Sequence, residues 1–167
     1  RILYTMIRSG NTSDKAYRKS ALQVGKVMGE LHPHGDSSIY ETMIKMSHYW
    51  NCWLMLVSIK GNNGNLSGDG AAAQRYTETR LNLWSEKIFS LFNKDSVDFI
   101  DNYDNTLQEP TVLPSLLPLL LINGTFGISV GFISSIPQHN PIQAIESYLL
   151  YCKKKKVSLD ELIEKLE

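Results

Sequence analysis

The strongest constraint on the fold is a break between two helical patterns at His32-Pro33-His34-Gly35. In residues 15–31, before this break, apolar side chains recur at spacings of three and four, which predicts a helix with one buried face. These side chains are Ala21, Val24, Val27, Met28 and Leu31. Because proline cannot donate the helical hydrogen bond and disfavours helix in the preceding residue, the first helix must end at this turn.

A second helix is predicted immediately after the turn. Asp36 or Ser37 is expected to cap its first turn, because both side chains can accept a hydrogen bond from a free backbone N–H group. Ile39, Met43 and Met46 fall on one face of this helix. Two helices joined by a tight turn form a helix-turn-helix unit, whose second helix enters the DNA major groove in proteins that use it.

The remaining chain shows strand, loop and helix patterns, and we expect the α+β class. We expect a strand over 54–59, followed by a loop rich in Gly, Asn and Ser over 60–70 and a helix over 83–92. A short strand with an acidic loop is expected over 97–114. A tight loop packed against a core is expected over 124–132, and Ser158 is expected to cap a last helix.

Pro110, Pro114 and Pro118 mark a change in sequence composition and suggest a domain boundary. We therefore expect one domain over 1–110 and the beginning of a second over 111–167. The chain starts without methionine inside an apolar pattern, so we expect an excerpt of a longer protein.

The charges are balanced overall but unevenly distributed. Lysine plus arginine and aspartate plus glutamate each number 17, whereas residues 1–60 carry eight basic and four acidic side chains. Residues 86–109 carry two basic and six acidic side chains, so the first third is locally basic. The neutral total argues against a nucleic-acid binder, but a total hides this distribution. Cys52 and Cys152 lie a hundred residues apart, which favours a reduced, cytoplasmic protein without a cysteine metal site. No apolar run reaches membrane-spanning length, so no membrane association is expected.

Three separated stretches, in this order, carry a family resemblance: "HPHGDSSIYETM", "GNNGNLSGDGAAAQRYTETRL" and "INGTFGISVGFISSIPQHN". Together they resemble the breakage-reunion core of bacterial type IIA DNA topoisomerases, the A subunits of gyrase and topoisomerase IV. The resemblance extends from Arg1 to about Asn140, and Glu41, Trp50 and the pair Asn62-Asn63 favour topoisomerase IV over gyrase. It implies a winged-helix, CAP-like domain over the first 110 residues, followed by the start of a tower domain.

The resemblance also implies a covalent mechanism centred on Tyr76. In this family the tyrosine attacks a DNA phosphate, and the arginine before it, here Arg75, stabilises the transition state. A phenol with a pKa of about 10 is a weak nucleophile at neutral pH, and a guanidinium fork matches the phosphate. Ala71 to Ala73 are small enough to let backbone approach DNA closely. The alternative is that the Tyr76 ring packs into the protein and Arg75 is merely solvated.

Further family positions are predicted to bind DNA. His32 and His34 lie near the scissile phosphate in relatives, where protonated histidine can donate to a phosphate oxygen; solvent-facing rings are the alternative. Leu117 matches a side chain that wedges between base pairs, although Leu116 and Leu119 depart from the family pattern and an ordinary core leucine remains the alternative. The candidate phosphate contacts are Lys15, Arg18, Lys19, Lys26 and Lys45, against the alternative of a solvated face.

Ser37 and Glu41 are four residues apart on one helix face and match the family's quinolone contacts, which predicts a quinolone-responsive target. The run of lysines over 153–156 precedes a helix cap and favours a solvated loop over a DNA-binding patch.

The implied activity is ATP-dependent cleavage and resealing of double-stranded DNA for strand passage. Mg²⁺ and ATP would be held by a separate B subunit, and no metal ligands are assigned to this chain. The implied assembly contains two A and two B subunits, with an A-subunit homodimer, in the bacterial cytoplasm. The alternatives are the corresponding piece of gyrase, which supercoils DNA, and a helix-turn-helix DNA-binding protein without catalytic activity.

Overall fold

The computed structural model describes residues 1–154 and 156–166 and divides into two compact units. Unit 1 comprises residues 1–51 and 55–116, and unit 2 comprises residues 52–54 together with the chain from residue 117 onward. Helices and short antiparallel strands are mixed in both units, which confirms the α+β class. Within the described residues, no helix is both long and apolar enough to cross a membrane.

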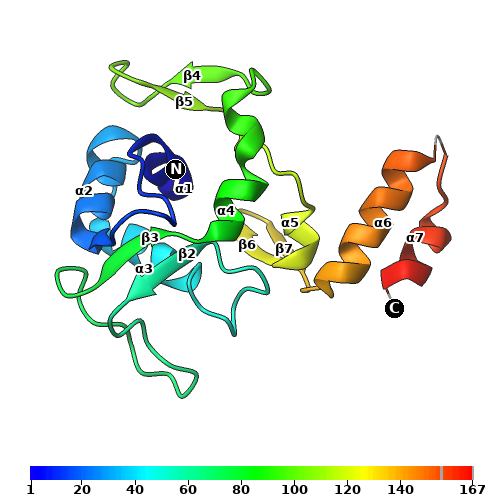
Figure 1. The fold of residues 1–167 in the computed structure, drawn as a ribbon, viewed down its shortest axis with the longest axis horizontal. Helices are drawn as coiled ribbons and strands as arrows, with labels where there is room; N and C mark the ends of the chain where they lie inside the picture. Colours follow the sequence, from blue (N-terminus) through cyan, green and yellow to red (C-terminus); the bar gives the residue numbers. More distant parts are fainter. Residues whose placement is uncertain (155, 167) are drawn as a thin grey trace. The chain divides into compact units, whose positions relative to one another are not determined.

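Unit 1 is built around three helices beside a three-stranded antiparallel sheet (Figure 1). The helices are α1 (Ile2–Arg8), α2 (Ser20–Glu30) and α3 (Asp36–Lys45), and the strands, in spatial order, are β1 (Arg18–Lys19), β3 (Glu78–Leu81) and β2 (Val57–Lys60). Buried side chains from these elements form one core. They are Met6, Val24, Val27, Ile39, Met43, Val57 and Leu81. Val24 and Val27 of the stripe predicted for α2 and Ile39 and Met43 of the stripe predicted for α3 belong to this core, as expected for amphipathic helices, whereas Met28 is 38% exposed.

The two predicted helices are present, with different starts. The first begins at Ser20 rather than at residue 15, because residues 18 and 19 pair with β3 instead. The predicted capping of α3 is wrong: Gly35 is the N-cap residue, and neither Asp36 nor Ser37 caps the helix through its side chain. The Ser38 hydroxyl donates instead to the Gly35 carbonyl oxygen at 3.0 Å.

The second half of unit 1 differs in detail from the expectation. The strand expected over 54–59 is β2, shifted toward residue 60, and the helix expected over 83–92 consists of α4 (Leu83–Ile88) followed by the 3₁₀ turn η1 (Ser90–Asn93). The expected acidic loop is a hairpin of β4 (Phe99–Asp101) and β5 (Gln108–Pro110), with Ile100 opposite Glu109. Helix α1 was not predicted.

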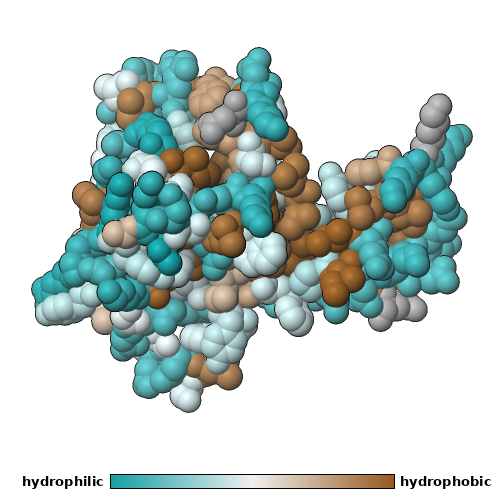
Figure 2. Space-filling view, viewed as in Figure 1, coloured by the Kyte–Doolittle hydropathy of each residue, from teal (hydrophilic) through white to brown (hydrophobic). Residues whose placement is uncertain are grey.

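Unit 2 contains a short helix, a hairpin and a pair of longer helices. Its elements are α5 (Leu119–Ile122), β6 (Thr125–Ser129), β7 (Phe132–Ile136), α6 (Pro141–Lys153) and α7 (Leu159–Leu166). The predicted cap of the last helix is confirmed, since the Glu161 amide donates to Ser158 Oγ at 3.2 Å. Helix α6, which the sequence patterns did not reveal, begins with Pro141 behind an Asn140 cap. Figure 2 shows apolar side chains among the polar surface of this helix.

The tight loop predicted over 124–132 is wrong, because this stretch forms the β6–β7 hairpin. Both strands are exposed along almost their whole length and do not pack against a core. Gly124 permits the entry into β6: its φ is +64°, and a Cβ there would lie 2.6 Å from the Ile136 carbonyl oxygen. Only glycine fits such a position.

Candidate functional site

The loop that precedes Arg75 and Tyr76 is folded on itself by asparagine side chains. Asn65 Oδ1 accepts from the Asp69 amide at 3.1 Å, and Asn65 Nδ2 donates to the Asp69 carboxylate at 2.6 Å. Gly64 has a φ of +91°, and a Cβ there would lie 2.8 Å from the Asp69 carbonyl oxygen. The Gly/Asn-rich composition therefore produces a compact loop, since asparagine side chains replace backbone partners in turns.

Residues 72–77, which we call the tyrosine arc, are attached to α2 and α3. The Tyr40 hydroxyl donates to the Ala72 carbonyl oxygen at 2.6 Å and lies 2.8 Å from Thr77 Oγ1. Thr77 Oγ1 in turn donates to Ser20 Oγ at 2.8 Å, so hydroxyls connect α3, the arc and α2. These contacts hold the arc at both of its ends.

Gln74 adds a third attachment in the middle of the arc. The Gln74 side-chain amide donates to the Asp36 carboxylate at 2.5 Å, and the Gln74 backbone carbonyl oxygen accepts from the Ala21 backbone amide at 3.2 Å. The arc is therefore positioned by the first turns of both helices of the helix-turn-helix unit.

Tyr76 projects from the held arc into solvent. The residue is 63% exposed, so the alternative in which its ring is packed inside the protein does not describe this structure. Arg75 is also exposed, and its guanidinium carbon lies 4.8 Å from the centroid of the Tyr76 ring. This separation is within the range of a cation–π contact, which places a permanent positive charge against the phenol.

The turn between α2 and α3 brings His32 and His34 together, with ring centroids 4.5 Å apart. His34 is exposed, whereas His32 is half-buried and its Nδ1 lies 2.9 Å from a terminal nitrogen of Arg1. Arg1 also forms a bidentate ion pair with Glu109 at 2.7 and 2.8 Å. Desolvation, the neighbouring His34 and the Arg1 charge lower the pKa of His32. The alternative of two solvent-facing rings is therefore wrong for His32.

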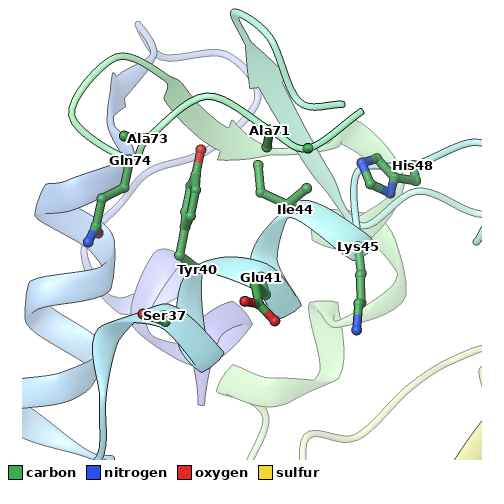
Figure 3. Close-up of a pocket in the computed structure, with 10 residues that line it drawn as sticks. Ser37, Tyr40, Glu41, Ile44, Lys45, His48, Ala71, Ala73 and Gln74 are labelled. Atoms are coloured by element: carbon green, nitrogen blue, oxygen red, sulfur yellow. The ribbon is translucent and has the colours of Figure 1, made fainter. Parts of the chain in front are cut away.

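Ser37, Glu41 and Lys45 lie one helical turn apart on α3 and line the same cavity of about 590 Å³. The opposite wall is formed by Ala71, Ala73 and Gln74 (Figure 3). In Figure 3 the Tyr40 ring points from α3 toward this wall, whereas Ser37 and Glu41 lie along the helix and Lys45 points away from the wall. Three of the predicted site residues therefore line the same cavity as part of the tyrosine arc.

The other predicted residues are more scattered. Lys19 is exposed on β1 and its ammonium lies 3.3 Å from the Glu78 carboxylate, whereas Lys26 is half-buried on α2. Leu117 is half-buried and belongs to unit 2, just before α5. In residues 1–154 and 156–166, no three His, Cys, Asp or Glu side chains gather as a metal-binding group.

Sequence reasoning missed several residues that position the site. Neither Tyr40 nor Gln74 was singled out in the sequence, because their contacts to the arc depend on the fold. Arg1 and Glu109 are separated by 108 positions, so no local pattern connects them.

Comparison with known proteins identifies relatives over nearly the whole chain. The family model for the A subunit of DNA gyrase/topoisomerase IV matches residues 1–166. The chain is 48% identical to the A subunit of DNA topoisomerase 4 from Staphylococcus aureus strain NCTC 8325, over 98% of this chain and 20% of the relative. The corresponding subunits of strains MRSA252 and Mu50 are 47% identical over the same shares.

The chain thus spans about a fifth of the length of these relatives. All three are topoisomerase IV subunits, in agreement with the predicted preference over gyrase. Both the family model and the relatives cover the tyrosine arc and the α2–α3 turn. This chain belongs to the family of DNA gyrase/topoisomerase IV A subunits.

Proposed function

We propose that this chain is part of the A subunit of an ATP-dependent type II topoisomerase, which cleaves and reseals double-stranded DNA for strand passage. Residues 1–110 would form a winged-helix cleavage domain, and residues 111–167 would begin the tower domain. The observation that carries this proposal is the exposed Tyr76 beside Arg75, on an arc held by the helix-turn-helix unit.

The proposed reaction is a reversible transesterification. Tyr76 Oη attacks the phosphorus atom, the bond from phosphorus to the 3′ oxygen breaks, and that oxygen takes up a proton while the phenol loses one. A 5′-phosphotyrosine link forms, and the free 3′ hydroxyl later attacks it to restore the strand. Because one phosphate ester replaces another, the energy needed for resealing is retained in the covalent link.

Arg75 would stabilise the charge that develops on the phosphate oxygens. Its guanidinium lies over the Tyr76 ring before DNA binds, so a small side-chain movement would carry it from the ring to the phosphate. His32 and His34 would position the same phosphate, while Lys19, Lys26 and Lys45 would contact the backbone on either side. Leu117 would wedge between base pairs.

The partners follow from the family. The described residues do not assemble a metal-binding group of their own, so we assign Mg²⁺ and ATP to a B subunit, in an assembly of two A and two B subunits in the cytoplasm. Bound Mg²⁺ supplies charge stabilisation for the transferred phosphate. Ser37 and Glu41 would contact quinolones at the cavity that they line with Ala73.

Covalent trapping tests the central proposal. Full-length A and B subunits are incubated with DNA, Mg²⁺ and a quinolone, detergent is added, and protein covalently attached to cleaved DNA is measured. Tyr76→Phe should abolish the attached protein, because it removes the attacking oxygen. Tyr49→Phe is the matched control, since Tyr49 is a similarly exposed tyrosine, 69% accessible. Persistent covalent product with Tyr76→Phe would assign the attack to another residue. DNA binding without covalent product in the wild type would favour a non-catalytic DNA-binding protein.

Arg75→Gln should slow single-turnover cleavage by about 10²–10³-fold, the usual effect of losing one transition-state donor. Arg75→Lys keeps the charge but not the planar fork, so it should lie between wild type and Arg75→Gln. Equal cleavage rates in all three proteins would remove Arg75 from the mechanism.

Ser37→Leu should raise the quinolone concentration needed to trap cleaved DNA while relaxation stays nearly unchanged. Thr42→Val is the control, because Thr42 is exposed on α3 but does not line the cavity. The same drug response in wild type and Ser37→Leu would contradict the assignment.

A further inference from the structure

The β4–β5 hairpin contacts the end of α2, directly before the two histidines. Asn102 Nδ2 donates to the Glu30 carbonyl oxygen at 2.6 Å, and the Tyr103 hydroxyl donates to the Gly29 carbonyl oxygen at 2.6 Å. Carbonyl groups in the last turn of a helix lack helical partners, so these donors satisfy them. The hairpin therefore fixes the backbone from which the His32 turn leaves α2.

A second contact reaches His32 itself. The Glu109 side chain, only 8% exposed, holds the Arg1 guanidinium through two charge-assisted hydrogen bonds of 2.7 and 2.8 Å. The remaining terminal nitrogen of Arg1 lies 2.9 Å from His32 Nδ1. A guanidinium has donors and no acceptor, so Nδ1 must accept this hydrogen bond. His32 is then neutral and carries its proton on Nε2.

We propose that Glu109 is a positioning residue, which holds Arg1 against Nδ1 of His32 and so fixes the tautomer whose Nε2–H donates to the DNA phosphate. The role of that donor rests on the proposed function. A neutral donor of fixed orientation replaces the protonated histidine expected from the sequence. The doubly held guanidinium gives the turn a defined geometry before DNA arrives.

The groups that face His32 agree with a neutral ring. They are the Arg1 guanidinium, the His34 ring and Glu109. Desolvation lowers the pKa of His32 most, His34 and Arg1 lower it further, and Glu109 raises it. A lowered pKa means that His32 stays neutral down to a lower pH than an ordinary histidine.

The protonation of His32 can be measured without DNA, in the full-length protein, by deuterium exchange at the imidazole C2 position followed with mass spectrometry. The wild-type midpoint should lie below about 6.5, the ordinary histidine value. A wild-type midpoint at or above that value overturns the proposal, and this measurement requires no variant.

Glu109→Gln distinguishes positioning from simple charge. The Arg1 side chain is 46% exposed, so a guanidinium released by this substitution can turn into solvent, and the His32 midpoint should then rise. If Glu109 acts only through its own charge, removing that charge should lower the midpoint. Asp101→Asn is the matched control, because it removes a carboxylate from the same hairpin without a contact to Arg1, and it should leave the midpoint unchanged.

Arg1→Gln provides a second route to the same conclusion if Glu109→Gln folds poorly. It should also raise the His32 midpoint, and the double variant should show no further increase, because Glu109 acts through Arg1. An unchanged midpoint in Arg1→Gln overturns the proposal, as does a fully additive rise in the double variant.

The catalytic consequence appears in the pH profile of single-turnover DNA cleavage by the assembled A and B subunits. In Glu109→Gln, neutral His32 can also adopt the Nδ1–H tautomer, which lacks the Nε2–H donor, so cleavage at pH values above the His32 midpoint should fall relative to the wild type. A changed midpoint with an unchanged profile overturns the role toward the phosphate. Absence of cleavage in the wild type at every pH would instead refute the proposed function, while the exchange measurement still tests the positioning of His32.

Discussion

Among the described residues, hairpins β4–β5 and β6–β7 differ in how they are held. Hairpin β4–β5 has strands of three residues and is attached to α2 and Arg1 by polar side chains that are themselves buried, Asn102 and Glu109. Hairpin β6–β7 has strands of five residues and more cross-strand pairs, yet Ile128 and Phe132 remain 75% and 79% exposed. Strand length and apolar content therefore did not decide which hairpin is anchored.

The contrast shows where a short hairpin obtains its stability. Two strands alone are marginal in water, so a hairpin depends on what it packs against. In β4–β5 a few directional hydrogen bonds to helix-end carbonyls provide this anchor. In β6–β7 the apolar side chains face solvent in the described structure, and the hairpin is stabilised by pairing between its two strands.

The largest effect should come from Asn102→Ala in the anchored hairpin. Asn102 donates to the Glu30 carbonyl oxygen and also accepts from the Thr106 and Leu107 amides, so its loss removes a partner from the part-buried Glu30 carbonyl and Leu107 amide. We expect the free energy of unfolding to fall by about 1–3 kcal/mol in urea titrations. Ser134→Ala, on exposed β7, is the control, and equal losses in both variants would break the comparison.

A smaller effect of opposite sign is expected from Asn105→Gly in the same hairpin. Asn105 has a φ of +57°, a conformation that glycine adopts without strain. Relief of the left-handed conformation, about 1–2 kcal/mol for a residue with a Cβ, is partly offset by about 0.4–1 kcal/mol for the greater unfolded-state entropy of glycine, so the net gain should be a few tenths to about 1 kcal/mol. A loss of stability in thermal unfolding would show that the asparagine side chain matters more than its backbone angle.

The smallest effect is expected from Phe132→Ala in the exposed hairpin. Truncating a ring that already faces solvent should change the free energy of unfolding of this chain by no more than about 0.5 kcal/mol. Urea titration measures it beside Asn102→Ala. A cost similar to that of Asn102→Ala would reveal a packed ring and would remove the distinction between the two hairpins.

Much of unit 1 could be predicted because its helices carry periodic apolar stripes and its turn contains proline. The family motifs likewise pointed to Tyr76 and Arg75, and the structure places both on an exposed, held segment. The α3 cap was missed because the local rule favours Asp and Ser side chains, whereas the Asp36 carboxylate bonds Gln74 instead. Tertiary partners outcompeted the local signal.

The remaining misses have a common physical origin. Hairpin β6–β7 was read as a packed loop because glycines and apolar residues are compatible with either, and periodicity cannot show whether a strand is covered. The ion pair between Arg1 and Glu109 depends on the complete fold of unit 1, so no spacing in the sequence could reveal it. The roles of these residues toward DNA stay predictions.

The Tyr40 hydroxyl has a mechanical consequence. It contacts Ala72 at one end of the tyrosine arc and Thr77 at the other, while its own backbone belongs to α3. A displacement of α3 must therefore also displace the tyrosine arc and Tyr76. In the proposed reaction, a DNA end attached covalently to Tyr76 would therefore move together with α3.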